Sequence, residues 1–490
     1  MKKKWATRAD DFAQWYLDCI ARANLAEHSI VKGCMIIKPL GYAIWERLQN
    51  ILDGLLKSTG HKNVYFPLFI PLSFLSKEAS HVAGFAQECA VVTHYRLRSD
   101  KTGVRMDESA RLAGPLIVRP TSEAIMWHTY RSWIRSHRDL PLLLNQWANV
   151  VRWELRTRLF LRTSEFLWQE GHTAHASSQE AQQEALRMLD IYTRFLEDYM
   201  AIPVIRGVKT ALERFAGAVD TYCIEALMQD AKALQAGTSH FLGQNFAKAF
   251  DVRYATPAGG LEYVWGTSWG VSTRLMGALI MVHGDDKGIV LPPKIAPNPI
   301  VIVPIFKTEA EKVQVLATAE QIHDTLQGAG INSVADLNEN RTPGWKFAEY
   351  EAQGIPLRIA IGPRDIESNS IEVTRRDTQT KATLKLSDLL PARIQKLLDD
   401  IQSNLLNKAK AFRKNNTQTT HNYDAFKDII AQKGGFVRAH WNGDAKIEAK
   451  IKEETQATIR CIPLDEPKQE GKCIYTGKKS PQEVIFAKSY

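Results

Sequence analysis

Two arginines, a carboxylate and aromatic rings gather in one predicted hairpin. Residues 149–154 and 162–170 flank a connecting stretch, and the first of them carries Arg152 and Glu154 two positions apart. Residues at that spacing on a strand point to the same face. Guanidinium groups suit phosphate and carboxylate oxygens, and an aromatic ring can stack on a base. The hairpin therefore predicts nucleotide binding, and a surface ion-pair ladder with core aromatics is the alternative.

A second candidate is Arg274, the single charged residue in an apolar stretch at 270–282 that predicts a helix. A buried arginine is costly unless an anion balances it. A phosphate ligand would supply that anion, and a structural carboxylate is the alternative. A third segment, 60–69, reads as a helix ending at Gly60 and a strand broken by Pro67, and by itself it is a weak signal.

The elements that position these residues belong to a long soluble-type chain. Its 490 residues suggest roughly three domains, and 44% hydrophobic with 24% charged residues is ordinary for a globular protein. A net charge of +9 hints at a polyanionic partner. Six cysteines without a CxxC pair fit a reducing compartment. We expect no signal peptide, no membrane span and a cytoplasmic location.

Periodicity divides the chain into an α+β region, a small α/β region and a distinct tail. Helices are expected at 10–25, 41–58 and 178–200, and strands at 64–69, 116–118 and 142–146. A proline-rich linker at 291–299 ends this region. Strands then alternate with helices over about 296–400, and the segment from 401 starts with a polar helix.

Several motifs occur together in one order along the chain. They lie at about 54–71, 149–170 and 270–285, with further segments at 119–123, 160–172, 235–240, 343–347 and 362–365 and a final Tyr490. In this order they resemble the class II aminoacyl-tRNA synthetases, and most closely the prolyl-tRNA synthetases of the archaeal/eukaryotic-like type. The resemblance covers nearly the whole chain.

The resemblance implies the fold and the reaction. It implies an α+β fold with an antiparallel-sheet catalytic domain over 1–290, an α/β anticodon-binding domain over 296–400 and a small α+β C-terminal domain over 401–490. The enzyme would activate L-proline with ATP, release pyrophosphate, and transfer proline to the 3′ end of tRNA(Pro). The first motif lies at a dimer interface in such enzymes, so a homodimer is expected.

The resemblance also assigns roles in ATP binding. Arg152 would hold the α-phosphate and the proline carboxylate, and Glu154 the adenine amino group or Mg²⁺. Arg162 and Arg274 would grip the β- and γ-phosphates as catalytic cations beside Arg152. Phe166 would stack on adenine, and the polar nucleotide contacts would come from Gln235, Thr238 and Ser272. For Ser272, a helix-face serine without function is the alternative.

For proline, the resemblance nominates a polar pair and an apolar wall. Thr121 and Glu123 would take the secondary ammonium, since one hydroxyl and one carboxylate satisfy its two donors. The ring would be walled by Phe85, Trp168, Phe215 and His240. A satisfied core histidine is the alternative for His240, and packing behind the pocket is the alternative for the aromatics.

For the anticodon, the nominated residues are charged groups of the second domain. They are Arg341, Lys346, Glu349, Arg364 and Asp365. Arginine and lysine suit guanine edges, and the proline anticodon ends in two guanines. Solvated helix or loop charges are the alternative for each residue.

The sequence departs from the family in two places. Related enzymes carry four zinc-binding cysteines in the C-terminal domain, but only Cys473, Cys461 and His440 can be assembled here, so no zinc is expected. The roughly 100 residues from Gly171 to Gly270 leave no room for the bacterial editing insertion. Binding discriminates weakly between similar side chains, so an editing factor acting in trans would fit.

Two rival functions stay open from the sequence. One is another synthetase of the same subclass, such as a threonyl, histidyl or glycyl enzyme, against which the set Thr121, Glu123, Trp168 and His240 argues. The other is a non-catalytic paralogue that binds RNA or regulates another enzyme. The presence of Arg152, Arg162 and Arg274 argues against that reading.

Overall fold

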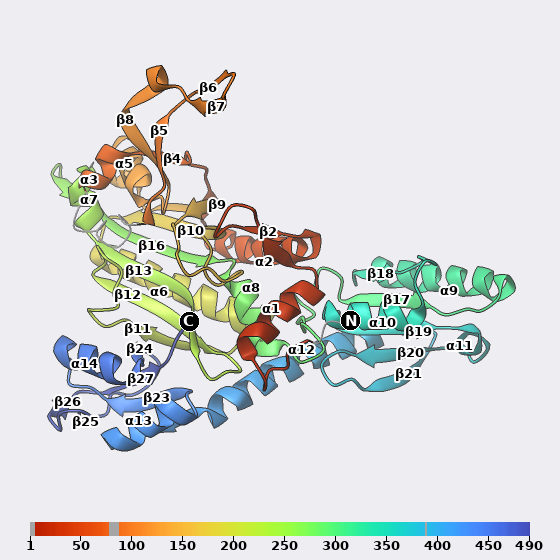
Figure 1. Ribbon diagram of the computed structural model, residues 1–490. Helices are drawn as coiled ribbons and strands as arrows, with labels where there is room; N and C mark the ends of the chain where they lie inside the picture. The colour runs from red at the N-terminus through yellow and green to blue at the C-terminus, as the bar shows by residue number, and fades with distance from the viewer. Residues whose placement is uncertain (1–4, 78–87, 388–389) are drawn as a thin grey trace.

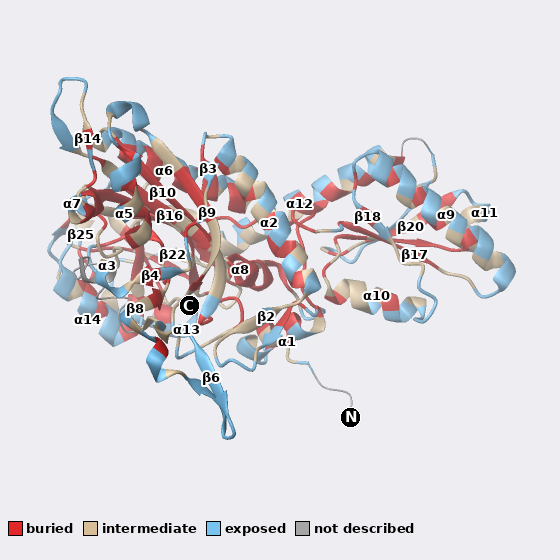
Figure 2. Cartoon of the chain, turned by 90° about the horizontal axis from the view of Figure 1, so that it is seen from above, coloured by how far each residue is buried: buried red, intermediate tan, exposed pale blue. Residues whose placement is uncertain are grey.

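The computed structural model describes residues 5–77, 88–387 and 390–490. A large body built on one sheet is joined to a smaller α/β domain, which lies to one side in Figure 1. Buried residues concentrate on the sheet strands and on the helix faces turned toward them (Figure 2). No helix within the described residues combines the length and apolarity needed to cross a membrane.

The central sheet carries the site. Its described strands run in the order β22-β23-β27-β24-β11-β12-β13-β16-β10-β9-β3. Its catalytic part consists of β3 (Lys62–Asn63), β9 (Leu142–Val151), β10 (Glu165–His175), β11 (Ile205–Val208), β12 (Asp220–Leu227), β13 (Ala233–Gly243) and β16 (Trp265–Ser272). From β11 to β9 each neighbouring pair is antiparallel. The α+β prediction is therefore confirmed.

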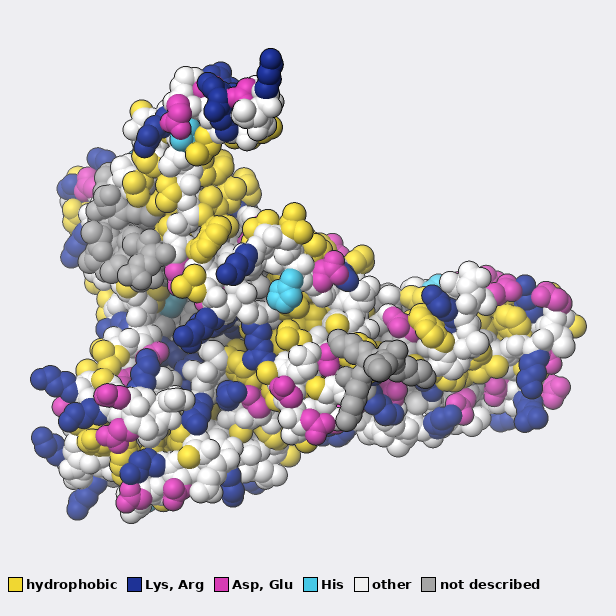
Figure 3. All heavy atoms as spheres, in the orientation of Figure 1, with side chains coloured by type: hydrophobic (Ala, Val, Ile, Leu, Met, Phe, Trp, Pro, Cys, Tyr) yellow, Lys and Arg dark blue, Asp and Glu magenta, His cyan; other side chains and the backbone are white. Residues whose placement is uncertain are grey.

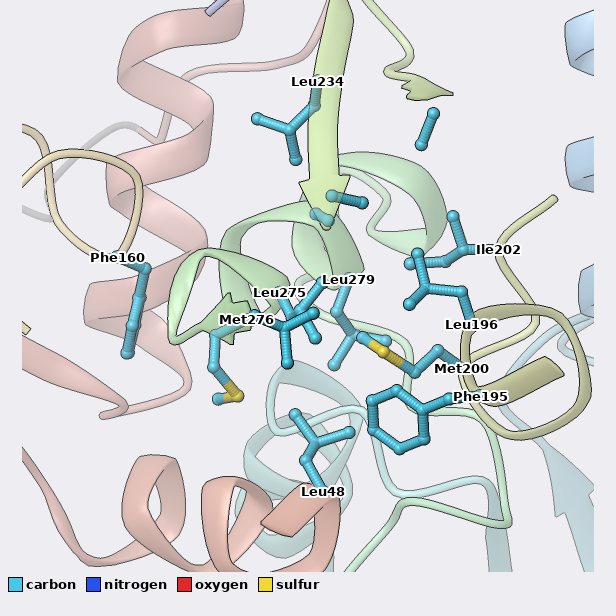
Figure 4. Packing of buried hydrophobic residues seen from close by; sticks show 14 of the residues in the cluster. Leu48, Phe160, Phe195, Leu196, Met200, Ile202, Leu234, Leu275, Met276 and Leu279 are labelled. Atoms are coloured by element: carbon cyan, nitrogen blue, oxygen red, sulfur yellow. The ribbon is translucent and has the colours of Figure 1, made fainter. Parts of the chain in front are cut away.

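Helices pack on one face of this sheet and close the main core. They are α1 (Phe12–Arg22), α2 (Pro39–Lys57), α6 (Ser178–Arg194) and α8 (Arg274–His283). Leu48 of α2 and Leu275 and Leu279 of α8 meet in this interior, beside Phe195 (Figure 4). Ser239 of β13 donates its hydroxyl to Ala185 O of α6, so its neighbours Thr238 and His240 face the opposite side of the sheet.

An arm projects from the catalytic body (Figure 1). It contains β4 (Phe69–Pro71), α3 (Leu72–Lys77), β5 (Val91–His94), β6 (Leu97–Asp100), β7 (Gly103–Met106) and β8 (Arg111–Val118). Near its base lie α5 (Glu123–Trp133), α7 (Asn245–Phe250), β14 (Arg253–Ala255) and β15 (Leu261–Tyr263), and β1 (Ala26–His28) pairs with β2 (Met35–Ile37) near α2.

The second domain is a sheet of order β18-β17-β19-β20-β21 with helices. Its elements are β17 (Ile300–Pro304), α9 (Glu309–Gly328), β18 (Ser333–Ala335), α10 (Pro343–Ala352), β19 (Leu357–Ile361), α11 (Pro363–Glu367), β20 (Ser370–Arg375) and β21 (Lys381–Lys385). β17 is parallel to both β18 and β19. These spans follow the elements expected from periodicity.

The C-terminal module continues the catalytic sheet. It contains α12 (Leu390–Asn415), β22 (Thr417–Thr419), α13 (Tyr423–Gln432), β23 (Phe436–His440), α14 (Ala445–Thr455), β24 (Thr458–Pro463), β25 (Gly471–Lys472), β26 (Lys479–Ser480) and β27 (Glu483–Ala487). β24 pairs with β11. A Cβ atom on Gly207 would lie 2.3 Å from Cβ of Cys461, so this close approach requires glycine.

Three local expectations need correction. The strand expected at 64–69 is replaced by β3 and β4 on either side, because Pro67 has no amide hydrogen for a ladder. The helix expected from 270 begins at Arg274, since 270–272 complete β16. The polar helix expected from 401 is α12 (Leu390–Asn415), which begins earlier and spans the expected start of the tail.

Candidate active site

A cavity of about 260 Å³ opens on the sheet face opposite α6. It is lined by side chains from β10, β13 and β16 and from the loop at 209–219. Predicted site residues make up much of its wall: Glu123, Arg152, Phe166, Trp168, Phe215, Gln235, Thr238, His240, Ser272 and Arg274. Sequence segments far apart in the chain therefore meet in one pocket.

Strand register explains this meeting. Phe166, Trp168, Glu170 and His172 alternate along β10 and face the pocket together. Trp168 pairs across the ladder with Ser272 of β16. Arg274 follows at the start of α8, where the chain leaves the sheet, so its side chain joins the same wall.

One end of the pocket is built around carboxylates. Thr121 donates its hydroxyl to Glu123. Glu170 is buried and accepts from Ser122 N (3.1 Å), the Ser122 hydroxyl, Gln146 Nε2 (2.9 Å) and His172 Nε2 (3.1 Å). These contacts occupy the accepting positions of the Glu170 carboxylate.

Glu123, Glu170 and His172 offer ligand atoms that all lie within 4.8 Å of one another. Because Glu170 is already saturated by protein donors, this cluster is a poor metal cage. Burial opposes a charged His172, but the Glu123 and Glu170 carboxylates raise its pKa. Two carboxylates beside one such imidazole form an anionic pocket end that suits an organic ammonium group.

An uncharged wall lies beside this end. Burial, together with the nearby charges of His172 and Arg152, lowers the pKa of His240 to about 3. The His240 ring stacks on Phe215 with centroids 4.6 Å apart, and its Nδ1 lies 3.0 Å from the Thr221 hydroxyl. A neutral imidazole on a phenyl ring suits a small apolar ring.

Two guanidinium groups also line the pocket. Arg152 donates from Nε to Pro120 O at 3.0 Å, and its guanidinium lies 5.3 Å from the Trp168 ring centroid. Arg274 donates to Leu161 O at 3.3 Å. Burial, with Arg162 and Arg152 close by, lowers the pKa of Arg274 to about 10. Clustered guanidinium groups of this kind bind phosphate and carboxylate oxygens.

Some polar atoms of the pocket wall are buried without a partner. Within the described part of the chain, Trp168 Nε1, His172 Nδ1 and Ser268 Oγ make no hydrogen bond. Such atoms are rare in folded proteins because leaving them unpaired is costly. Their position around one cavity fits a polar ligand that would satisfy them.

Four predicted site residues lie elsewhere or are not described. Thr121 stands behind Glu123 and is not part of the cavity wall. Glu154 and the half-exposed Arg162 face each other 3.5 Å apart beyond the cavity rim. Phe85 lies outside the described residues.

Sequence reasoning missed several wall residues. Glu170 and His172 continue the alternation that starts at Phe166, so the period of two in a strand could have revealed them. Thr221 is found only through its pairing with His240 across β12 and β13. Glu213 and Ser268 carry no comparable signal in the sequence.

The anticodon candidates differ in accessibility. Arg341 and Arg364 are exposed, and the Arg341 guanidinium lies over the Trp345 ring. Lys346 is instead buried, with Nζ 2.8 Å from Asp336 O. The Asp365 carboxylate accepts from Gly362 N at 2.8 Å and caps α11, whereas Glu349 accepts from Gln353. Burial and capping contacts thus favour structural roles for Lys346 and Asp365.

The candidate zinc ligands point to separate partners. Cys473 Sγ lies 3.7 Å from Asn442 Oδ1, and His440 Nδ1 lies 3.3 Å from Ser480 Oγ. Cys461 is buried against Cys223.

Comparison with known families assigns the fold and pocket to a class. Residues 108–283 match the tRNA synthetase class II core domain (G, H, P, S and T), and residues 299–397 match the anticodon binding domain. The antiparallel sheet with its pocket is therefore the core of a class II aminoacyl-tRNA synthetase.

The C-terminal module and whole-chain relatives narrow this class. Residues 423–490 match the C-terminal domain of prolyl-tRNA synthetase. Proline--tRNA ligases of Porphyromonas gingivalis and Cytophaga hutchinsonii are 60% and 59% identical to the chain; each alignment covers the whole chain and 99% and 100% of the relative. A proline--tRNA ligase of Bacteroides fragilis is 58% identical over the whole chain and 99% of its own length. The chain belongs to the prolyl-tRNA synthetase family, as the motifs predicted.

Proposed function

We propose that the pocket is where this proline--tRNA ligase joins L-proline to ATP, before proline is transferred to tRNA(Pro). One observation carries the proposal. A single cavity of about 260 Å³ is lined both by the carboxylates Glu123 and Glu170 and by the guanidinium groups of Arg152 and Arg274. An amino acid bound between them would place its ammonium at one end and its carboxylate toward the phosphates.

The activation step needs no side-chain base. The proline carboxylate is already ionised, attacks the α-phosphorus in line, and pyrophosphate leaves. Catalysis then rests on positioning and on neutralising the charge of the transition state. Arg152 would bind the α-phosphate and the proline carboxylate, and Arg274 with Arg162 the β- and γ-phosphates.

The remaining nucleotide contacts follow from the pocket wall. Phe166 offers a ring face for adenine, while Gln235, Thr238 and Ser272 offer polar groups. Mg²⁺ would enter with ATP as part of the substrate, bound by phosphates and few carboxylates. Glu154 would contact it or the adenine amino group; its carboxylate already accepts from Arg156 N at 2.8 Å.

The proline ring would lie on the neutral wall. Glu123 would accept from the secondary ammonium, with Thr121 holding the Glu123 carboxylate in place. Trp168, Phe215 and His240 would surround the ring. Phe85 would complete this wall, as the family resemblance implies.

The second domain would read the anticodon of tRNA(Pro). Its exposed guanidiniums, Arg341 and Arg364, are our candidates for guanine contacts, with the half-exposed Glu349 beside them. We propose that residues 1–290, 296–400 and 401–490 act as three functional units, and that α12 links the last two units.

We also propose a homodimer. Apolar side chains are exposed around the first motif and the arm, among them Tyr42, Tyr65, Phe69, Leu72 and Val91. Hydrophobic side chains gather over β4, β5 and β8 on the face shown in Figure 3. An exposed apolar surface of this kind is typical of a protein–protein interface.

Three further proposals concern what surrounds the reaction. The C-terminal module would fold on its apolar cluster without zinc, since its candidate ligands are apart. An editing factor would act in trans, because the described elements between β10 and β16 pack into the catalytic body. The cytoplasm, where tRNA is charged, would be the location.

Pyrophosphate exchange tests the central proposal. Radioactive pyrophosphate should enter ATP only when proline is added, with no tRNA required, and the rate should fall at least 100-fold in Arg152→Ala. Exchange driven by another amino acid would reject proline as the substrate of this pocket. No exchange with any amino acid, from a folded protein, would reject activation itself.

A further inference from the structure

The loop at 209–219 forms part of the pocket wall and is held from outside the catalytic core. It has no regular secondary structure between β11 and β12. Glu213 and Phe215 from this loop line the cavity. Phe215 N donates to the Thr221 hydroxyl at 3.0 Å, which also contacts His240 Nδ1, so the loop and the imidazole wall are connected.

Two side chains and one backbone carbonyl of the C-terminal module contact the same loop. The Thr210 hydroxyl donates to Glu448 Oε1 of α14 at 2.7 Å, and both residues are buried. Lys452, one turn further along α14, lies 3.3 Å from Glu213 Oε1. Lys209 Nζ donates to Arg460 O of β24 at 2.6 Å. These contacts run from Lys209, at the start of the loop, to Glu213, two residues before Phe215.

We propose that α14 of the C-terminal module is a positioning element for proline, which sets the place of Phe215 by holding the loop through Glu448 and Lys452. The inference rests on the proposed pocket for proline. Glu448 and Lys452 do not touch the cavity themselves and act through Thr210 and Glu213.

The geometry predicts which substrate is affected. Phe215 stacks on His240 at the neutral wall, whereas Arg152 and Arg274 are held by Pro120 O and Leu161 O and not by residues of this loop. Loosening α14 should therefore weaken proline binding and leave ATP binding and turnover nearly unchanged. A module needed only for overall folding would instead lower all of these together.

Matched variants of the buried contact provide the first test. Thr210→Val removes the donor and keeps the shape, while Thr210→Ser keeps the donor. Glu448→Ala removes the acceptor, while Glu448→Gln keeps one. In proline-dependent pyrophosphate exchange, Thr210→Val and Glu448→Ala should raise KM for proline about threefold to tenfold, the size expected for one buried hydrogen bond. Thr210→Ser and Glu448→Gln should restore it, and kcat and KM for ATP should stay within about twofold.

An exposed contact provides the second test, with little risk to folding. Lys452→Ala should raise KM for proline by up to about threefold, as expected for a surface pair. Lys450→Ala, a charge removal on an exposed residue of the same helix, is the control and should behave as wild type.

A normal KM for proline in Thr210→Val, Glu448→Ala and Lys452→Ala would overturn the inference, as would a decrease in kcat accompanied by equal increases in the KM values for proline and ATP. If the wild type itself shows no proline-dependent exchange, the proposed function fails, which is a separate result.

Discussion

Two regions of the central sheet bury charged side chains, and they differ in how the charges are balanced. The first is the junction cluster, formed by Lys209, Glu225 and Arg460 where the C-terminal module meets β11 and β12. Lys209 Nζ lies 2.8 Å from Glu225 Oε1, and Arg460 Nε and Nη2 lie 3.1 and 3.0 Å from the two Glu225 oxygens. Both cations of this cluster pair with the same buried carboxylate, Glu225, within the chain.

The pocket shows the opposite arrangement. Within the described residues, the Arg274 side chain makes no ion pair and donates only to a backbone carbonyl. Its neighbours Arg162 and Arg152 are also cations, which contributes to its lowered pKa. The carboxylates Glu123 and Glu170 line the same cavity, and their charges act on Arg152, but no described carboxylate pairs with Arg274.

The difference shows two reasons for burying a charge: the junction cluster stabilises the structure, whereas the pocket is suited to bind a ligand. Desolvating an ion is costly, so a paired cluster such as the junction cluster marks a fixed interface. A cation that faces a cavity and makes no ion pair among the described residues, as Arg274 does, marks a place where a substrate anion completes the balance. The same sheet carries both, and only the second should respond to ligands.

The largest effect is expected from breaking the junction cluster. Glu225→Gln would leave Lys209 and Arg460 buried without a full counter-charge, and removing one partner of a buried pair costs about 3–5 kcal/mol. The free energy of unfolding, measured by urea denaturation, should fall by that amount. Glu372→Gln, which breaks the exposed pair with Lys381, is the control and should cost under about 1 kcal/mol. A loss in Glu225→Gln no larger than in the control would refute the contrast.

In the pocket we expect the opposite result, a loss of activity without a loss of stability. Arg274→Ala should slow pyrophosphate exchange about 10²–10³-fold, because it removes a group that stabilises charge in the transition state. Its free energy of unfolding should change by less than about 1 kcal/mol, since the fold gains no ion pair from this cation. Exchange assays and urea denaturation on the same preparation give both values. A variant as unstable as Glu225→Gln would show that Arg274 is structural.

Stabilisation by bound substrates should also distinguish the pocket from the junction cluster. Proline with a non-hydrolysable ATP analogue, each at about 100 times its Kd, should stabilise the wild type by at least about 2.7 kcal/mol. The shift in thermal midpoint should vanish in Arg274→Ala and survive in Glu225→Gln, whose pocket cations are intact. An equal shift in both variants would place ligand binding elsewhere.

The sequence predicted the family, the class of fold and the order of domains well. Arg152, Trp168, Thr238 and Arg274 were nominated from motifs, and all four line one cavity. Motifs work here because Trp168 and Thr238 lie on strands and Arg152 and Arg274 lie where the chain leaves a strand, so the sheet fixes where these side chains stand. The individual roles of these residues stay predictions.

What the sequence could not supply were contacts between distant segments. Nothing near Glu225 indicates that its partner is 235 positions away at Arg460, because the pairing arises only when β24 joins β11. The burial of Lys346 could not be predicted for a related reason: its ion pair with Asp336 forms across the turn before α10. Charge type alone does not reveal burial.

The smallest expected effect distinguishes the two regions by pH. The folded-state pKa of His240, about 3, lies below the ordinary value of 6.5, so the unfolded chain takes up the proton first as pH falls. Stability from the neutral imidazole is therefore complete above about pH 6.5 and decreases below it, by about 1 kcal/mol between pH 6.5 and 5.5. Glu225 is an acid whose pKa is lowered by Lys209 and Arg460 against the opposing effect of burial, so the junction cluster should stay paired throughout this range.

His240→Gln should remove about 1 kcal/mol of the pH dependence measured by urea denaturation, whereas His28→Gln, at an exposed position, should not. If His240→Gln retains the full wild-type dependence, the imidazole is charged in the folded protein, and the pocket wall is not the neutral surface that the proline ring requires.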